Sequence, residues 1–353
     1  MPDDSRPSKR SRVDEAATSG DSSVTPLDDL KRDPDIWLED GNIVIVARDV
    51  AFRTYRGLLT KQSTVFADMF GAGDLAADES LDGCPVVRLP DAPSDLKHLL
   101  HSLVPSTGRT LLQCKRPIAF PELFAIIRLS HKYNIEDLLG QGLHILKTLY
   151  TTSFRQFEGD AYRHANLQYP HPEYHIGAVN LARLTNNLSI LPVALYHCCG
   201  LSGKVMDGWT RDTGETEFLS AQDIRAVITG RDQLARKGFR TLLNIFDEDT
   251  SSGCTQPGVC MIGLAGLIRS VRWDGAGEYD ILDSWKPVIK RFTKELGLCK
   301  PCRDRLVKRD LKERREVWEK LPSLFGLSKD DCQWNKPVGG DDSESNSGES
   351  DSD

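Results

Sequence analysis

The sequence lacks any apolar run of the roughly 20 residues that a membrane-spanning helix needs. Its start, MPDDSRPSKRSRVDE, contains no apolar segment and so does not have the pattern of a secretory signal. Without such a signal, the nine scattered cysteines are expected to be reduced thiols or metal ligands. These absences predict a soluble intracellular protein in the nucleus, the cytoplasm or both.

Short enzyme motifs are missing as well. The sequence has no glycine-rich phosphate loop, no G-x-S-x-G elbow and no H-E-x-x-H pair. His171 and His175 are four residues apart, but Pro170 and Pro172 argue against a helix there, so we expect a surface loop. We predict no catalytic residues and no enzymatic activity. A net charge of −7 speaks against non-specific binding to nucleic acid.

The composition divides the chain into four segments. Residues 1–33 and 329–353 contain few large apolar side chains, so we expect disordered tails. The first tail holds the basic run Ser8 to Arg12, which is either a nuclear-import signal or an ordinary solvated charge cluster. The second ends in the acidic, serine-rich GGDDSESNSGESDSD. Residues 34–152 and 153–328 are the predicted folded domains.

The most informative stretch lies between Asp40 and Phe70. Asn42 to Ala47 is a β-branched apolar run, and Val50 to Tyr55 alternates apolar and polar residues after a turn, which predicts a hairpin. Ser63 is a predicted N-cap for a short helix that carries Val65, Phe66, Met69 and Phe70 on one face.

This order of elements resembles the BTB/POZ family, and the sequence motifs of the chain are most similar to those of basidiomycete-type fungal BTB proteins. The resemblance extends over about Asp35 to Leu327. It implies a third strand at 84–91, a third helix at 95–104 and a final helix pair at 120–146. The residues that match the family pattern are Phe52, Arg56, Leu59, Ser63, Phe66, Met69 and Phe70.

The fold class implied is α+β, with a BTB/POZ-like domain of about three strands capped by helices, followed by an α-helical C-terminal domain. The resemblance implies a homodimer or another protein partner, and a third-helix surface for a cullin-type ubiquitin-ligase scaffold. Tyr55 stands where the family has His, and Asn42 stands where it often has Asp. Arg56 therefore lacks its usual anionic partner, so we expect that it is either solvated or paired with another acid, such as Asp49.

The second half is predicted to be helical. Residues 173–190 carry an apolar stripe, and Ser220 with Asp223 resembles a helix start. Further helices are expected at 278–296 and 303–321. The last of these is rich in Lys and Arg, but acids interleave with them, as in Asp310 and Arg314. We therefore expect a solvated helix surface rather than a nucleic-acid-binding face.

Two cysteine pairs lie in this half. Cys254 and Cys260 are in a Gly/Thr/Pro segment, and Cys299 and Cys302 form a C-x-x-C motif ahead of a helix. Two such pairs can hold a structural zinc ion through four thiolates. Two alternatives are ordinary reduced thiols and a redox-active C-x-x-C motif, although no thioredoxin-like βαβ pattern surrounds it.

The sequence therefore predicts a non-enzymatic protein–protein interaction module that acts as a scaffold or adaptor. It requires no cofactor except the possible structural zinc. The alternatives are a nuclear transcriptional regulator that recruits co-regulators through the BTB-like domain, and a C-x-x-C thiol-redox protein.

Overall fold

The computed structural model of the chain describes residues 25–71, 79–104, 111, 117–159, 167–168, 171–247, 249–273 and 280–335. The basic run Ser8 to Arg12 and the acidic residues 341–353 lie outside these residues. Both predicted tails extend too far into the folded chain. Lys31–Trp37 is a strand, and Trp334 is buried against Trp318 with ring centroids 4.7 Å apart.

The N-terminal part is built on a sheet whose strands lie side by side in the order β1 (Lys31–Trp37), β3 (Val50–Thr54), β2 (Ile43–Ala47), β5 (Cys84–Leu89) and β4 (Ser80–Leu81). Strand β2 (Ile43–Ala47) pairs antiparallel with β3 (Val50–Thr54) and parallel with β5 (Cys84–Leu89). All five residues of β2 are buried, because alternate side chains enter apolar clusters on opposite faces of the sheet. The hairpin and the third strand are therefore found where the pattern predicted them.

The sheet has five strands in the described chain, not the three that we predicted. The two that were missed lie at its edges: β1 (Lys31–Trp37), parallel to β3, and the two-residue β4 (Ser80–Leu81), antiparallel to β5. The sequence KRDPDIW of β1 contains a proline and four charges, a composition that edge strands tolerate and central strands do not.

Five helices belong to this N-terminal part: α1 (Arg56–Gln62), α2 (Thr64–Gly71), α3 (Pro93–Leu103), α4 (Phe120–Lys132) and α5 (Glu136–Leu149). Ser63 caps α2 as predicted, because its hydroxyl accepts a hydrogen bond from Phe66 N at 3.0 Å. The same hydroxyl donates to the carbonyl of Tyr133, which ties the α1–α2 junction to the end of α4. Phe52, Leu59 and Phe66 are fully buried.

Arg56 is solvated, which was one of the two predicted outcomes. Its side chain is exposed and donates to the carbonyl of Phe70 at 2.6 Å. The alternative partner Asp49 was wrong, because that carboxylate pairs with Lys31 at 2.8 Å. Asn42 instead accepts a hydrogen bond from the backbone N–H of Arg56, at the start of α1.

The rest of the described chain is mostly helical, so the molecule is of mixed α+β class. Short elements lie between the long helices, including the β6–β7 hairpin (Trp209–Thr210 and Thr216–Glu217). The helices are α6 (Phe154–Glu158), α8 (Tyr174–Leu184), α9 (Leu191–Cys199), α10 (Ala221–Ile245), α11 (Pro257–Trp273), α12 (Lys286–Leu296), α13 (Lys300–Glu319) and α14 (Leu321–Leu324). None of the described helices is long and apolar enough to cross a bilayer.

One apolar core runs through the sheet unit and the helices that follow it. Phe120 of α4 stacks on Tyr174 of α8 at 5.0 Å and meets Trp209 of β6 edge-on at 5.5 Å. The predicted boundary between residues 152 and 153 thus falls inside this core. A second, separate core lies farther along the chain, within residues 242–307, which we call the distal module.

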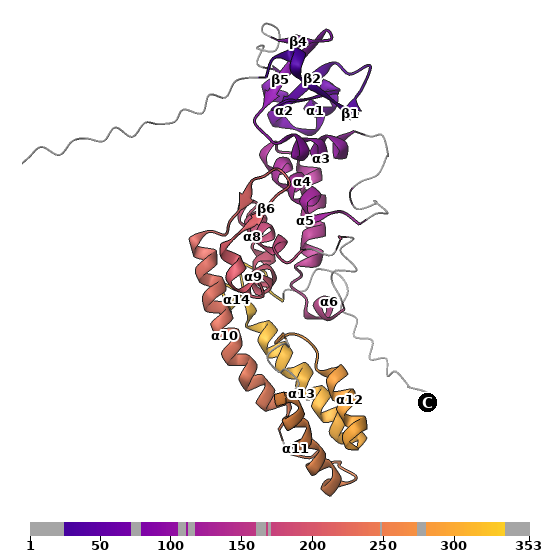
Figure 1. The fold of residues 1–353 in the computed structure, drawn as a ribbon, viewed down its shortest axis with the longest axis vertical. Helices are drawn as coiled ribbons and strands as arrows, with labels where there is room; N and C mark the ends of the chain where they lie inside the picture. Colours follow the sequence, from indigo (N-terminus) through magenta and orange to yellow (C-terminus); the bar gives the residue numbers. More distant parts are fainter. Residues whose placement is uncertain are drawn as a thin grey trace, which may run out of the picture.

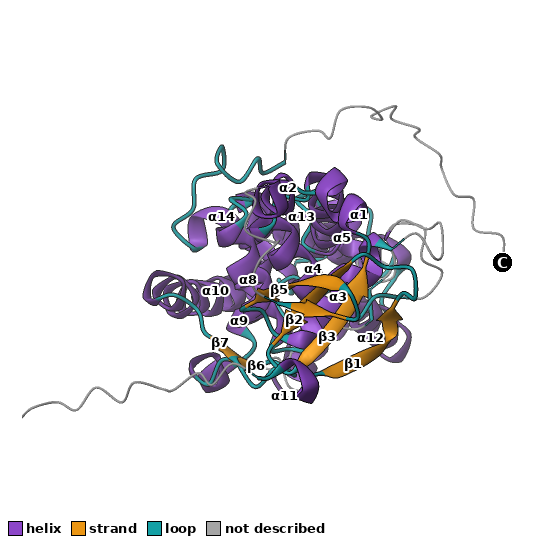
Figure 2. Cartoon of the chain, turned by 90° about the horizontal axis from the view of Figure 1, so that it is seen from above, coloured by secondary structure: helices purple, strands orange, loops and turns teal. Residues whose placement is uncertain are grey.

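The molecule is elongated, with the sheet unit at one end and the distal module at the other (Figure 1). Helix α10 starts at Ala221 and runs from the first core to the second. Its N-cap is Ser220, as predicted, whose hydroxyl accepts a hydrogen bond from Asp223 N at 3.1 Å. Gly230 lets α10 approach the ring of Phe325 so closely that a Cβ there would clash. Seen from the sheet end, the strands lie in front of the helices (Figure 2).

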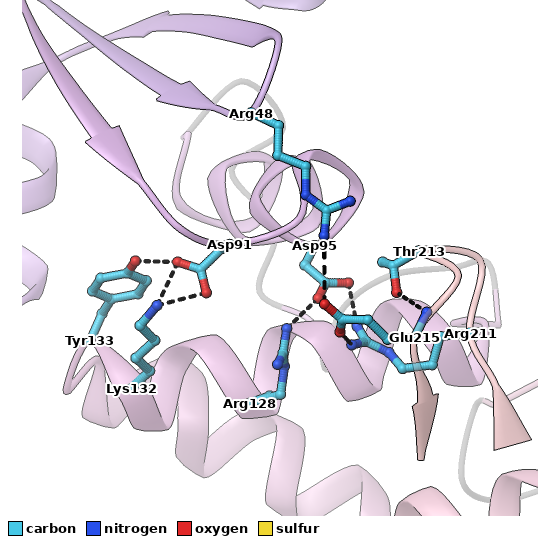
Figure 3. A network of polar contacts seen from close by, with 9 residues as sticks. All are labelled: Arg48, Asp91, Asp95, Arg128, Lys132, Tyr133, Arg211, Thr213 and Glu215. Atoms are coloured by element: carbon cyan, nitrogen blue, oxygen red, sulfur yellow. Dashed lines mark hydrogen bonds and ion pairs between the residues drawn. The ribbon is translucent and has the colours of Figure 1, made fainter. Parts of the chain in front are cut away.

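Charged side chains fasten the β6–β7 hairpin to the sheet unit (Figure 3). Arg211, between β6 and β7, donates to both carboxylate oxygens of Asp95 on α3, at 2.6 and 2.5 Å. Arg128 of α4 reaches the same carboxylate at 2.6 Å, and Glu215 pairs with Arg211 at 2.9 Å. Arg211 and Asp95 are both buried, so this network joins the two predicted domains through the interior.

Two predictions about polar residues were wrong. Asp310 and Arg314 of α13 are buried rather than part of a solvated surface. The Asp310 carboxylate accepts from Trp285 N and Ser284 Oγ as well as from Arg314. His175 does not lie in a surface loop, because it is buried in α8 within hydrogen-bond distance of the Tyr150 hydroxyl.

Candidate metal centre

The four cysteines predicted to bind zinc come together in the distal module. Cys254 lies in the loop between α10 and α11, and Cys260 lies in the first turn of α11. Cys299 is the N-cap residue of α13, and Cys302 lies in the first turn of that helix. One ligand atom from each lies within 4.8 Å of the others, and this is the only such group of Cys, His, Asp or Glu among the described residues.

Local sequence explains the position of the C-x-x-C pair. Gly297 ends α12 in the left-handed conformation, with φ of 67°, which favours glycine. The chain then turns through Leu298 into α13, where Pro301 occupies the first turn without loss of a helical hydrogen bond. Cys299 and Cys302 thus leave one turn of backbone in the same direction, as in a zinc knuckle.

The spacing of the thiols fits a tetrahedral metal. Four sulfur ligands about 2.3 Å from a central zinc ion would lie about 3.8 Å from one another. The Sγ atoms of Cys254 and Cys299 are 3.7 Å apart. All four cysteines are free thiols, and three of them are buried. The donor set is thus all sulfur and closed, which suits zinc in a structural role.

Backbone N–H groups point at the sulfur atoms. The N–H of Cys299 donates to Cys260 Sγ at 3.3 Å, and the N–H of Ser251 donates to Cys302 Sγ at 3.4 Å. Such bonds stabilise thiolate ligands and fix their direction. These donors come from the α12–α13 turn and from the loop after α10, so the backbone itself shapes the site.

The pKa values of the clustered thiols are shifted in different directions. Burial acts to raise the pKa of Cys299, but hydrogen bonds from the backbone of Thr255 and Cys302 and from neighbouring thiols outweigh it and lower the pKa to about 6. Burial raises the pKa of Cys302 to about 12 and also raises the pKa of Cys260. Four thiolates at these distances repel one another, so a bound cation is needed to hold them all deprotonated.

The cysteine cluster lies in the core of the distal module. Cys260, Cys299 and Cys302 belong to this core. The other buried residues of the core are Ile245, Phe246, Leu264, Leu267, Trp285, Val288, Ile289, Leu298 and Leu306. A metal bound here would link the α10–α11 loop, α11 and α13 at one point.

Sequence reasoning found all four thiols but not the element that carries Cys260. The segment between Cys254 and Cys260 contains Thr255, Pro257 and Gly258, so we expected a loop where a helix of 17 residues begins at Pro257. The wide C-x5-C spacing is bridged because the chain bends at Thr255 and enters α11 before it reaches Cys260. Proline at the first helical position was the available signal.

Comparisons of the chain with protein-family models, with curated proteins and with solved structures give no match. The resemblance to BTB/POZ domains therefore stays a prediction from the sequence.

Proposed function

We propose that the chain is a non-enzymatic protein-interaction scaffold. In this proposal a BTB/POZ-like N-terminal unit associates with a second copy or another protein, and a helical part presents a second surface. A structural zinc ion, held by Cys254, Cys260, Cys299 and Cys302, stabilises the distal module.

The observation that carries the proposal is the exposed apolar surface of α10 and α11. Exposed apolar side chains that lie together in a contiguous patch mark protein-contact sites, whereas apolar side chains scattered singly over a surface do not. Ile262 of α11 is 75% exposed and Phe239 of α10 is 69% exposed. The other large exposed apolar residues on these helices are Ile228, Leu243, Val259 and Met261.

The closed geometry of the cysteine cluster supports a structural role for the metal. Four sulfur ligands complete the tetrahedral sphere of zinc, and zinc has no redox chemistry of its own, so it would supply folding energy rather than catalysis. The distal core contains few residues, and small cores commonly depend on metal ligation. The buried backbone-bonded thiols favour this role over a redox-active C-x-x-C motif, which needs an accessible sulfur.

The order of elements supports the BTB/POZ-like assignment. A hairpin, two short helices, a strand, a helix and a helix pair follow one another over residues 43–149, as the resemblance implies. The residues of the family pattern at Phe52, Leu59, Phe66 and Phe70 are buried.

Contact with a cullin-type scaffold receives less support. Helix α3 packs its leucines inward, and Asp95 is covered by Arg211 of the β6–β7 hairpin. Lys97 is engaged by Asp33 and Asp35, at 3.0 and 2.6 Å. The exposed strip that α3 offers to a partner is therefore narrow.

Native mass spectrometry of the full chain tests the proposal, because one spectrum reports both subunit number and bound metal. We expect a dimer with one zinc ion per chain. Cys302→Ser should lose the zinc, whereas the matched control Cys332→Ser, a buried thiol outside the cluster, should retain it. A metal-free monomer that captures no protein partner would refute the scaffold proposal.

A further inference from the structure

A basic groove lies beside the cysteine cluster. It has a volume of about 1050 Å³ and is open to solvent along one side. The loop at Asp249–Ser252 forms one wall, and the N-terminal half of α13 forms the other. Ser251 of the loop donates its N–H to Cys302 Sγ, so the same cluster that orders the distal module holds this wall in place.

The charge of the groove is strongly one-sided. Five cations line it, against two acids, Asp249 and Asp304, although the chain carries a net charge of −7. The five are Lys300, Arg305, Lys308, Arg309 and Lys312. Lys300, Lys308 and Lys312 recur at intervals of four or eight residues, which places them along one side of the helix.

The two arginines bind residues of the loop that follows α10, whereas the three lysines are available to bind a ligand. Arg305 donates to the backbone carbonyls of Asp249, at 2.9 Å, and of Thr250, and Arg309 pairs with Asp247 at 3.1 Å. Within the described part of the chain, Lys300 and Lys308 have no ion-pair partner. Lys312 lies 3.9 Å from Glu316, a loose and exposed pair.

The chain itself supplies a complementary segment. Residues 341–353, DDSESNSGESDSD, contain six acids, five serines and no basic residue. The described chain ends at Asn335, which accepts a hydrogen bond from Trp318 Nε1 of the same helix α13 at 3.3 Å. Trp318 lies six residues from Lys312, or about 9 Å along the helix axis.

The reach of the intervening residues is sufficient. Residues 336–340 span up to about 17 Å when extended, which carries the chain from Asn335 to the Lys312 end of the groove. The acidic residues then span up to about 43 Å, against about 18 Å of helix between Lys312 and Lys300. A tether this short gives an effective concentration in the millimolar range.

The geometry points to residues 341–353 of this chain as the occupant of the groove, bound through Lys300, Lys308 and Lys312. A nucleic acid fits the groove less well, because no aromatic residue lines it for base stacking. The inference goes beyond the proposed scaffold function and does not depend on it: the groove between α13 and the Asp249–Ser252 loop would be a docking site for acidic, serine-rich peptides, occupied from within the same chain.

The test uses a fluorescent peptide of residues 340–353, measured by polarisation at low salt. We expect it to bind a chain that ends at Gly340 and to bind the full chain at least tenfold more weakly, because the chain's own segment competes. Phosphoserine at Ser343 and Ser345 adds about three negative charges and should tighten binding severalfold. Raising the salt concentration should weaken binding of both peptides.

A charge-reversal variant and a matched control locate the site. Lys300→Glu/Lys308→Glu/Lys312→Glu should lose at least tenfold in affinity in the shortened chain. The control Lys286→Glu/Lys290→Glu/Lys294→Glu makes the same charge change on α12, outside the groove lining, and should lose less than threefold. Equal losses in the two variants, or equal binding to the full and shortened chains, would overturn the inference.

Folding of the variants and the nature of the ligand are checked in the same series. An unfolding midpoint and a circular-dichroism spectrum equal to those of the unmodified chain, measured for the groove variant, exclude collapse of the distal module as the cause of lost binding. A single-stranded oligonucleotide of equal charge that binds more tightly than the phosphopeptide would overturn the assignment to the acidic segment and leave a general polyanion site.

Discussion

Removal of the Asp95 carboxylate tests how strongly the helical part is joined to the sheet unit. In Asp95→Ala, Arg211 loses both of its hydrogen bonds to α3 while it stays in a buried position. Stranding a buried charge in this way costs about 3–5 kcal/mol of the free energy of unfolding. Arg211 keeps Glu215 at 2.9 Å and its position over the Phe124 ring, so we expect the lower end, about 3 kcal/mol.

The double variant separates the lost pair from the stranded charge. In Asp95→Ala/Arg211→Met the guanidinium is gone, and an apolar side chain faces Phe124 instead. Buried ion pairs are commonly replaced by apolar residues at little net cost, so the double variant should recover at least half of the loss. Arg128 is 30% exposed and can be hydrated when Asp95 is absent.

The assay is urea unfolding, together with hydrogen exchange of the β6–β7 hairpin and α3. The control is Asp232→Ala, which breaks a solvent-exposed pair with Arg236 at 2.9 Å and should cost less than about 1 kcal/mol. If Asp95→Ala costs no more than this control, or if exchange at the hairpin does not rise, the network does not hold the two parts together.

Three further predictions follow from packing, ligation and titration. Gly230→Ala should lower the free energy of unfolding by about 1–3 kcal/mol, because the added Cβ would clash with the ring of Phe325. The control Gly238→Ala lies on the same helix, where the nearest atom to an added Cβ is 3.9 Å away, and it should raise the free energy of unfolding by up to about 1 kcal/mol. Urea unfolding compares the two variants. Removal of metal by a chelator should raise hydrogen exchange in α11 and in the first turns of α13 while the exchange of β2 stays unchanged, because the four clustered thiols lie in or against the distal core and not in the first core. Burial lowers the pKa of His197 to about 4, so between about pH 6.5 and pH 4 the unfolded chain binds a proton that the folded chain rejects, and stability should fall as pH drops through this window. A His197→Gln variant should show a shallower loss in the same range, and equal slopes for the two proteins would contradict the assignment to His197.

The sequence predicted the elements whose signals are local. The hairpin at Ile43–Thr54 has period-two alternation, α2 has a serine cap, and α10 begins at Ser220 with its acid in the first turn. Each of these depends on neighbours within a few residues, so a single chain read by pattern contains the information.

Edge strands and buried charges were missed for a common reason. Strand β1 has a charged, proline-containing sequence, and its strand geometry comes from pairing with β3. Asp310 and Arg314 look like a solvated i, i+4 pair, yet both are buried. Ser284 and Trp285 donate hydrogen bonds to Asp310, and Arg314 lies over the Phe154 ring and pairs with Glu158. The hydrophobic periodicity of a segment does not indicate which residues from distant parts of the chain pack against it.

The candidate metal centre shows most clearly which properties the sequence determines and which depend on tertiary structure. The residue types and the C-x-x-C spacing alone identified Cys254, Cys260, Cys299 and Cys302 as ligand candidates, because thiolate chemistry and knuckle geometry are local properties. Whether the two pairs meet was decided by tertiary structure: α11 and α13 each begin beside the loop after α10, and the distal core holds both starts together. The sequence by itself determined the chemistry of the site, and only packing over 45 residues of separation brought Cys254 and Cys299 to 3.7 Å.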